Sequence, residues 1–131
     1  MTGSANALQA AIHAQLTGDA TLAAMIGPDA VFDRRGSGKP MPYLVLSEIT
    51  TRDFAPGMEE HEVRIEAWSD AGGRKQSQDI AARVTTLLDG ASLSPAGFSL
   101  VNLVHRSTRS RRELKTRAQV AEMVFRAVTD G

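Results

Sequence analysis

Apolar and polar residues alternate along residues 62–67, and this two-residue period is typical of a β-strand with one buried face. Its apolar members are Val63, Ile65 and Ala67. After the glycines at 72–73 the period becomes that of a helix, with apolar residues at three- and four-residue spacing. These residues are Ile80, Val84, Leu87 and Leu88. The pattern therefore predicts a half-buried strand, a turn and a helix that packs on the sheet.

The N-terminal part of the chain has the pattern of two short helices. The first is expected over residues 5–17, with Ser4 as its N-cap. Its buried face would consist of Leu8, Ile12 and Leu16. Gly18 would end this helix, and the carboxylate of Asp19 would cap the second, which stops at the Gly-Pro pair at 27–28.

Further strands complete the predicted order of elements. A short strand is expected at 31–32, followed by a strand at 43–50 that is apolar on both faces and would lie inside the sheet. Two more are expected at 98–105 and 118–129, and the last has an apolar face of Ala121, Met123, Phe125 and Ala127. The order α-α-(β)-β-β-α-β-β indicates a single α+β domain over residues 1–131, with helices on one face of a mainly antiparallel sheet.

Charge is unevenly distributed, although the chain is neutral overall with 15 basic and 15 acidic residues. A basic set lies in residues 105–117, of which we expect 106–117 to be a loop. Its members are Arg106, Arg109, Arg111, Arg112, Lys115 and Arg117. An acidic set precedes it: Glu59, Glu60, Glu62 and Glu66. Opposite charges on one chain favour contacts between its copies, so we interpret both sets as subunit interfaces. Two alternative interpretations of the basic set are a solvated loop without a partner and a surface that faces a DNA channel.

Residue types that carry catalysis or bind metals are sparse. The chain has no cysteine, which excludes disulfides and thiolate metal sites. Its three histidines have no metal-ligand spacing, and no Gly-x-Ser-x-Gly sequence is present. We therefore expect no enzymatic activity, no metal and no cofactor. Neither a signal peptide nor an apolar run of about 18 residues is visible, so a membrane partner is not expected.

Two connections are the predicted docking sites for other proteins. Residues 33–42 and 51–60 are rich in glycine, proline and mixed charges, and we expect them to be long loops. Loops of this composition tolerate the irregular backbone that recognition surfaces need.

The ordered set of segments resembles the tail-completion or tail-terminator proteins of long-tailed phages and gene transfer agents. The segments that carry this likeness are ALQAAIHAQLTGDATLAAMIG, VFDR, PYLVLSEITTRDF, EEHEVRIEAWSDAGGRK, IAARVTTLL and QVAEMVFRAVTD. The resemblance implies a structural virion protein at the head–tail junction, assembled in the bacterial cytoplasm. It also implies a homohexameric ring that caps the tail tube protein, meets the head-side connector or stopper protein and lets DNA pass through.

A different class of protein is the alternative that the residues leave open. The basic residues in 105–117 could serve a small nucleic-acid-binding module, although no helix-turn-helix, zinc finger or aromatic RNA-binding motif accompanies them.

Overall fold

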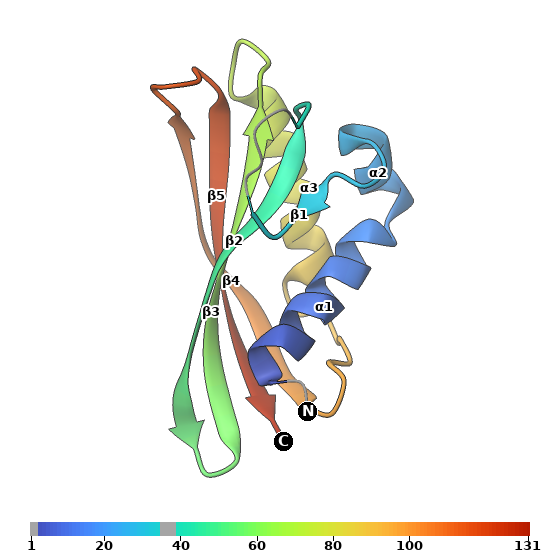
Figure 1. Ribbon diagram of the computed structural model, residues 1–131, viewed down its shortest axis with the longest axis vertical. Helices are drawn as coiled ribbons and strands as arrows, with labels where there is room; N and C mark the ends of the chain where they lie inside the picture. Colours follow the sequence, from blue (N-terminus) through green and yellow to red (C-terminus); the bar gives the residue numbers. More distant parts are fainter. Residues whose placement is uncertain (1–2, 35–38) are drawn as a thin grey trace.

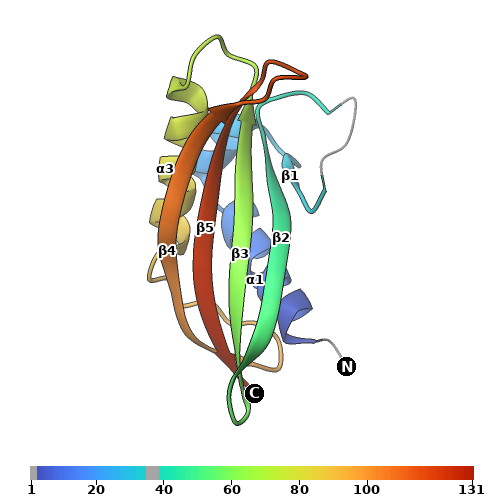
Figure 2. The same ribbon diagram turned by 90° about the vertical axis from the view of Figure 1, so that its left-hand side faces the viewer.

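A β-sheet with three helices on one of its faces forms the part of the chain that the structure describes, residues 3–34 and 39–131 (Figures 1 and 2). The structure is a computed structural model. The helices are α1 (Ser4–Thr17), α2 (Ala20–Ile26) and α3 (Lys75–Leu88). The strands are β1 (Val31–Phe32), β2 (Tyr43–Ala55), β3 (Met58–Ser69), β4 (Ser99–Arg112) and β5 (Gln119–Asp130). The predicted α+β class and element order are confirmed.

The strand order is β1-β2-β3-β5-β4, which places β3 and β5 at the centre of the sheet. β1 pairs with β2 in parallel, and the other neighbours are antiparallel. β2 and β5 run toward the end of the molecule where the C-terminus lies, and β3 and β4 run away from it (Figure 1). The long axis of the sheet is therefore also the direction of its strands.

The core fills the space between the helices and the covered face of the sheet. The predicted apolar residues of β3 and β5 are all fully buried there: Val63, Ile65, Ala67, Ala121, Met123, Phe125 and Ala127. The predicted apolar stripes of α1 and α3 close the core from the other side: Leu8, Ile12, Leu16, Ile80, Val84 and Leu88. Removal of these surfaces from water is the main driving force that holds the helices on the sheet.

The first helix begins differently from the prediction. Gly3 occupies the N-cap position of α1. Ser4 lies inside the helix, and its hydroxyl donates to Glu59 on β3. The second cap is as predicted, because the Asp19 carboxylate accepts from Leu22 N at 2.8 Å. Both carboxylate oxygens of Asp19 also accept from Arg83 of α3, at 2.9 and 2.7 Å, which lowers the pKa of Asp19 and joins α2 to α3.

The prediction for the second strand was partly wrong. β2 continues to Ala55 and turns directly into β3, so residues 51–60 form a hairpin and not a long loop. A β-bulge between Leu46 and Glu48 shifts the register, which places Glu48 on the same face as Val45. β1 pairs only with Leu44 and Val45, so the remaining outer edge of β2 has no partner strand among the described residues. The expected loop at 33–42 is described only in part, since residues 35–38 lie outside the described residues.

The basic segment was also assigned wrongly. β4 extends to Arg112, so much of the expected loop at 106–117 is strand, and the turn to β5 begins only after Arg112. β4 is the outermost strand of the sheet. An edge strand exposes one face and one row of backbone groups to water, so it tolerates charged side chains without an alternating apolar pattern. This is why hydrophobic periodicity gave no sign of a strand at 106–112.

Candidate assembly surfaces

One face of the sheet carries no helix (Figure 2). Ion pairs on this face join neighbouring strands. At its centre, Glu60 of β3 accepts from Arg126 of β5 at 2.6 Å and from Arg52 of β2 at 2.7 Å. The hydrogen bond from Arg126, followed by that from Arg52, lowers the pKa of Glu60. The Glu60 carboxylate therefore stays charged to lower pH than an ordinary glutamate, and it links three adjacent strands.

The other members of the acidic set have partners in their own chain as well. Glu62 accepts from Arg64 at 2.8 Å, and Glu66 accepts from Trp68 Nε1 at 3.0 Å and from Arg111 at 3.4 Å. Glu59 accepts from the Ser4 hydroxyl. Three of the four glutamates thus face arginines within the chain. Their contact with a neighbouring subunit stays a prediction.

The basic set is divided by the structure. Arg111 pairs with Glu66 and with Glu113, at 3.4 and 3.5 Å. The others are exposed, and no carboxylate of the described residues lies within ion-pair distance of them: Arg106, Arg109, Arg112, Lys115 and Arg117. These five arginine and lysine side chains lie along one edge of the sheet and the turn that follows it. They are the cations of the set that are available to a partner.

The turn between β4 and β5, residues 113–118, is held by its own hydrogen bonds. Glu113 N donates to Ala118 O at 2.8 Å and Arg117 N donates to Glu113 O at 2.7 Å. The Glu113 carboxylate also accepts from Lys115 N at 3.1 Å. Arg117 has a φ of 63°, in the left-handed region. This ordered turn leaves the Leu114 side chain 89% exposed. We call residues 112–117 the basic turn.

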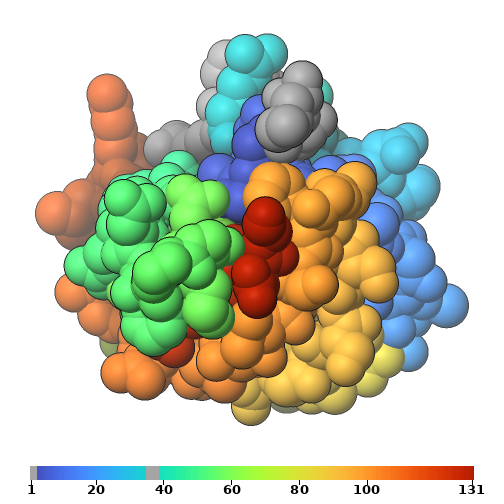
Figure 3. Space-filling model, turned by 90° about the horizontal axis from the view of Figure 1, so that it is seen from below, coloured from blue at the N-terminus to red at the C-terminus, as the bar shows by residue number. Residues whose placement is uncertain are grey.

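The hairpin between β2 and β3 has a charge opposite to that of the basic turn. Its tip, residues 53–59, encloses a hollow of about 540 Å³ lined by Asp53, Phe54, Ala55, Pro56, Gly57, Met58 and Glu59. Phe54 is 52% exposed, and the Arg126 guanidinium lies 5.4 Å from its ring centroid. The tip projects beside the C-terminus, where Gly131 N donates to Gly57 O at 3.1 Å (Figure 3). We call residues 53–59 the acidic hairpin.

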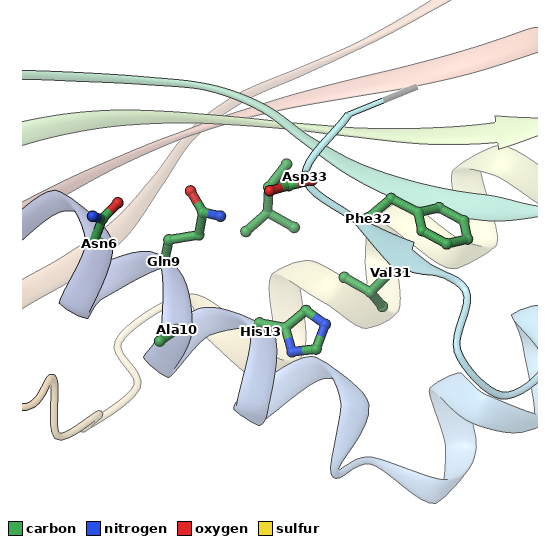
Figure 4. Close-up of a pocket in the computed structure, with 8 residues that line it drawn as sticks. Asn6, Gln9, Ala10, His13, Val31, Phe32 and Asp33 are labelled. Atoms are coloured by element: carbon green, nitrogen blue, oxygen red, sulfur yellow. The ribbon is translucent and has the colours of Figure 1, made fainter. Parts of the chain in front are cut away.

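A second hollow separates α1 from β1 and the residue after it (Figure 4). It measures about 510 Å³, and its polar lining consists of Asn6, Gln9, His13 and Asp33. Two amides, one imidazole and one carboxylate form a polar groove. Within residues 3–34 and 39–131, no three histidine, aspartate or glutamate side chains gather in a way that could hold a metal ion.

One histidine was not recognised as part of the core. His61 is fully buried on the covered face of β3. Its Nδ1 lies 2.8 Å from Thr51 Oγ1, and its Nε2 lies 2.9 Å from Thr129 Oγ1. Burial lowers the pKa of His61, and the charge of Glu59 offsets this only in part. The only signal in the sequence was the two-residue spacing of His61, Val63 and Ile65, which places the three side chains on the same face of a strand.

None of the helices in the described part of the chain is long and apolar enough to cross a membrane.

A family model described as "Tail completion protein gp17" matches residues 10–130. The chain belongs to the tail completion protein family. Among solved structures, a chain of the "Virion of native gene transfer agent (GTA) particle" has a TM-score of 0.89 and 33% sequence identity, with 100% of both chains covered. No curated protein sequence matches the chain. The resemblance inferred from the sequence is thus confirmed, and this tail completion protein is a structural tail protein.

Proposed function

We propose that this tail completion protein is a tail terminator. In this proposal it forms a homohexameric ring that caps the tail tube and joins it to the connector or stopper protein on the head side. The observation that carries the proposal is the full-length likeness, with a TM-score of 0.89, to a chain of a gene transfer agent virion. Its place would be the head–tail junction, after assembly in the bacterial cytoplasm.

The two sides of the sheet support ring formation. β4 forms one edge of the sheet. The part of β2 that does not pair with β1 forms the other edge. Each edge therefore has a row of backbone groups with no partner strand among the described residues. The two edges differ in sequence and charge, as do the two ends of the sheet, so a contact between copies would be head-to-tail. A head-to-tail contact generates a closed ring when its rotation closes. A ring of this chain bound to the end of the tube would cover the surface on which a further tube layer would add, and its bore would let DNA pass.

The proposal is tested by deleting the gene in cells that produce the particle. We expect DNA-filled heads to accumulate separately from tails, and tail tubes to lose their uniform length, because nothing would end tube growth or join the tube to the head. Expression of the intact chain from a plasmid should restore joined particles. Joined particles of normal tail length in the deletion strain would contradict the proposal. Loss of DNA from otherwise joined particles would favour the nucleic-acid-binding alternative.

A further inference from the structure

The basic turn and the acidic hairpin lie at opposite ends of the sheet (Figures 1 and 2). β5 connects their levels, since Gln119 pairs with Arg112 beside the basic turn and Asp130 pairs with Met58 in the acidic hairpin. A strand of this length spans roughly 40 Å at about 3.3 Å per residue. The two surfaces therefore cannot touch within one chain.

The basic turn presents one exposed apolar side chain among exposed cationic side chains. Leu114 is the most exposed large hydrophobic residue described, at 89%. Arg112, Lys115 and Arg117 beside it are exposed. The acid of the turn, Glu113, is engaged by Lys115 N and by Arg111. Because hydrogen bonds already order the turn, little conformational entropy would be lost when it binds a partner.

The acidic hairpin has the complementary chemistry. Phe54, Pro56 and Met58 contribute apolar side chains to the lining of its hollow, and Asp53 and Glu59 contribute carboxylates. Asp53 has no cationic partner among the described residues, so its charge is available. The Asp130 carboxylate lies beside the same tip, next to Gly57. The hollow is therefore lined by both apolar side chains and carboxylates.

We infer that the basic turn of one copy binds the acidic hairpin of the next copy, with Leu114 against Phe54 and Met58. Lys115 would then lie near Asp53. The contact would be the one that closes the ring, and in this respect it rests on the proposed function. A second copy fits both the charge and the apolar surface, whereas a DNA phosphate backbone would match the cations and leave Leu114 without an apolar partner. Since the basic turn and the acidic hairpin are different surfaces, the contact repeats head-to-tail from copy to copy.

Disulfide cross-linking in assembled particles tests this contact, because the chain has no cysteine of its own. The variant Leu114→Cys with Phe54→Cys should form covalent multimers up to the size of the ring under mild oxidation. A distance of about 40 Å within one chain excludes an internal disulfide, which needs Cα atoms within about 7 Å. Either single variant should give no ladder. Leu114→Cys with Ala24→Cys on the exposed side of α2 is the matched control and should also give none.

A charge exchange tests the same contact without cysteine, and it applies if the Phe54 variant fails to fold. Lys115→Glu should lower incorporation into particles by roughly tenfold or more, because it faces like charges at the contact. Addition of Asp53→Lys should restore most of the incorporation. Both Lys115 and Asp53 are exposed, so the fold should survive each change.

The outcomes separate the contact from the function. Particles that hold the protein at the head–tail junction but give neither the ladder nor the rescue would overturn the contact and leave the terminator function standing. Particles with no copy at the junction would overturn the function and the contact together. If Lys115→Glu weakened duplex DNA binding by the chain and Asp53→Lys gave no rescue, the basic turn would be a DNA contact and the inference would be wrong.

Discussion

The same two strands, β3 and β5, build two faces with opposite chemistry. On the face under the helices, Val63, Ile65 and Phe125 are fully buried. On the other face, Glu60, Arg64 and Arg126 form ion pairs that remain partly in contact with water. Residues next to each other in sequence therefore have separate roles. The covered face determines whether the chain folds, and the uncovered face and its hairpins determine what the folded chain presents to its neighbours.

The energetic cost of a substitution should follow this division. A side chain removed from the covered face leaves a cavity in a packed interior. A charge removed from the uncovered face is replaced by water, and exposed ion pairs contribute little to stability. Four predictions test the difference, from the largest expected effect to the smallest.

The largest effect is expected for Phe125→Ala on the covered face. Phe125 is fully buried and packs edge-on against His105, with ring centroids 5.5 Å apart. Its truncation should lower the free energy of unfolding by about 3–5 kcal/mol, as for other buried aromatic residues. Urea denaturation followed by circular dichroism measures this. Arg126→Ala, one residue along on the other face, is the control, and an equal loss in both variants would contradict the division.

A smaller loss is expected for His61→Leu. The leucine side chain would fill most of the space of the imidazole. It would leave the hydroxyls of Thr51 and Thr129 without their imidazole partner. The free energy of unfolding should fall by about 1–3 kcal/mol, the usual cost of an unsatisfied buried polar group. The triple variant with Thr51→Val and Thr129→Val should recover part of the loss. If the triple variant is no more stable than His61→Leu, the hydroxyls are not the cause.

The third prediction concerns pH and the same histidine. Burial holds the pKa of His61 in the folded chain below its ordinary value of 6.5, which is its value in the unfolded chain. Below pH 6.5 the unfolded chain takes up a proton that the folded chain does not, so stability falls with decreasing pH until the folded-state pKa is reached. Urea midpoints measured between pH 7.5 and pH 5 should show this fall. The fall should be weaker in His61→Leu, and identical slopes in both proteins would rule out His61 as the source.

The smallest effect on stability is expected for Arg52→Ala on the uncovered face. The Arg52 side chain is 69% exposed, and Glu60 retains its second partner, Arg126. The unfolding temperature should change less than in either variant above. The pKa of Glu60 should rise toward its ordinary value, because one of the two hydrogen bonds that lower it is gone. A carboxylate NMR titration measures the shift, and an unchanged Glu60 pKa would show that Arg126 alone controls this group.

The sequence predicted the helices and strands that bury one face against the apolar core. The faces of β3, β5, α1 and α3 followed directly from periodicity, since each has an apolar stripe packed on the core. Periodicity failed for the end of β2 and for the second half of β4, which are edge segments in contact with water. The bulge between Leu46 and Glu48 was equally hidden, because backbone register depends on the partner strand.

The candidate surfaces were predicted in part for a related reason. Charge counting located the basic and acidic sets, but pairs such as Glu60–Arg126 and Glu66–Arg111 join positions far apart in sequence. Only the strand order brings such residues together. The exposed Leu114 had one visible signal, an isolated leucine between Glu113 and Lys115 in a charged segment. The acidic hairpin was predicted as a loop, so its hollow was not foreseen.

A cryo-EM reconstruction of the head–tail junction of purified particles tests the central claim most directly. The account predicts a single hexameric ring of this chain between the last layer of the tail tube and the head-side connector. It also predicts that the basic turn of each copy lies against the acidic hairpin of the next. A junction without this chain, or copies of it stacked along the length of the tube, would contradict the account.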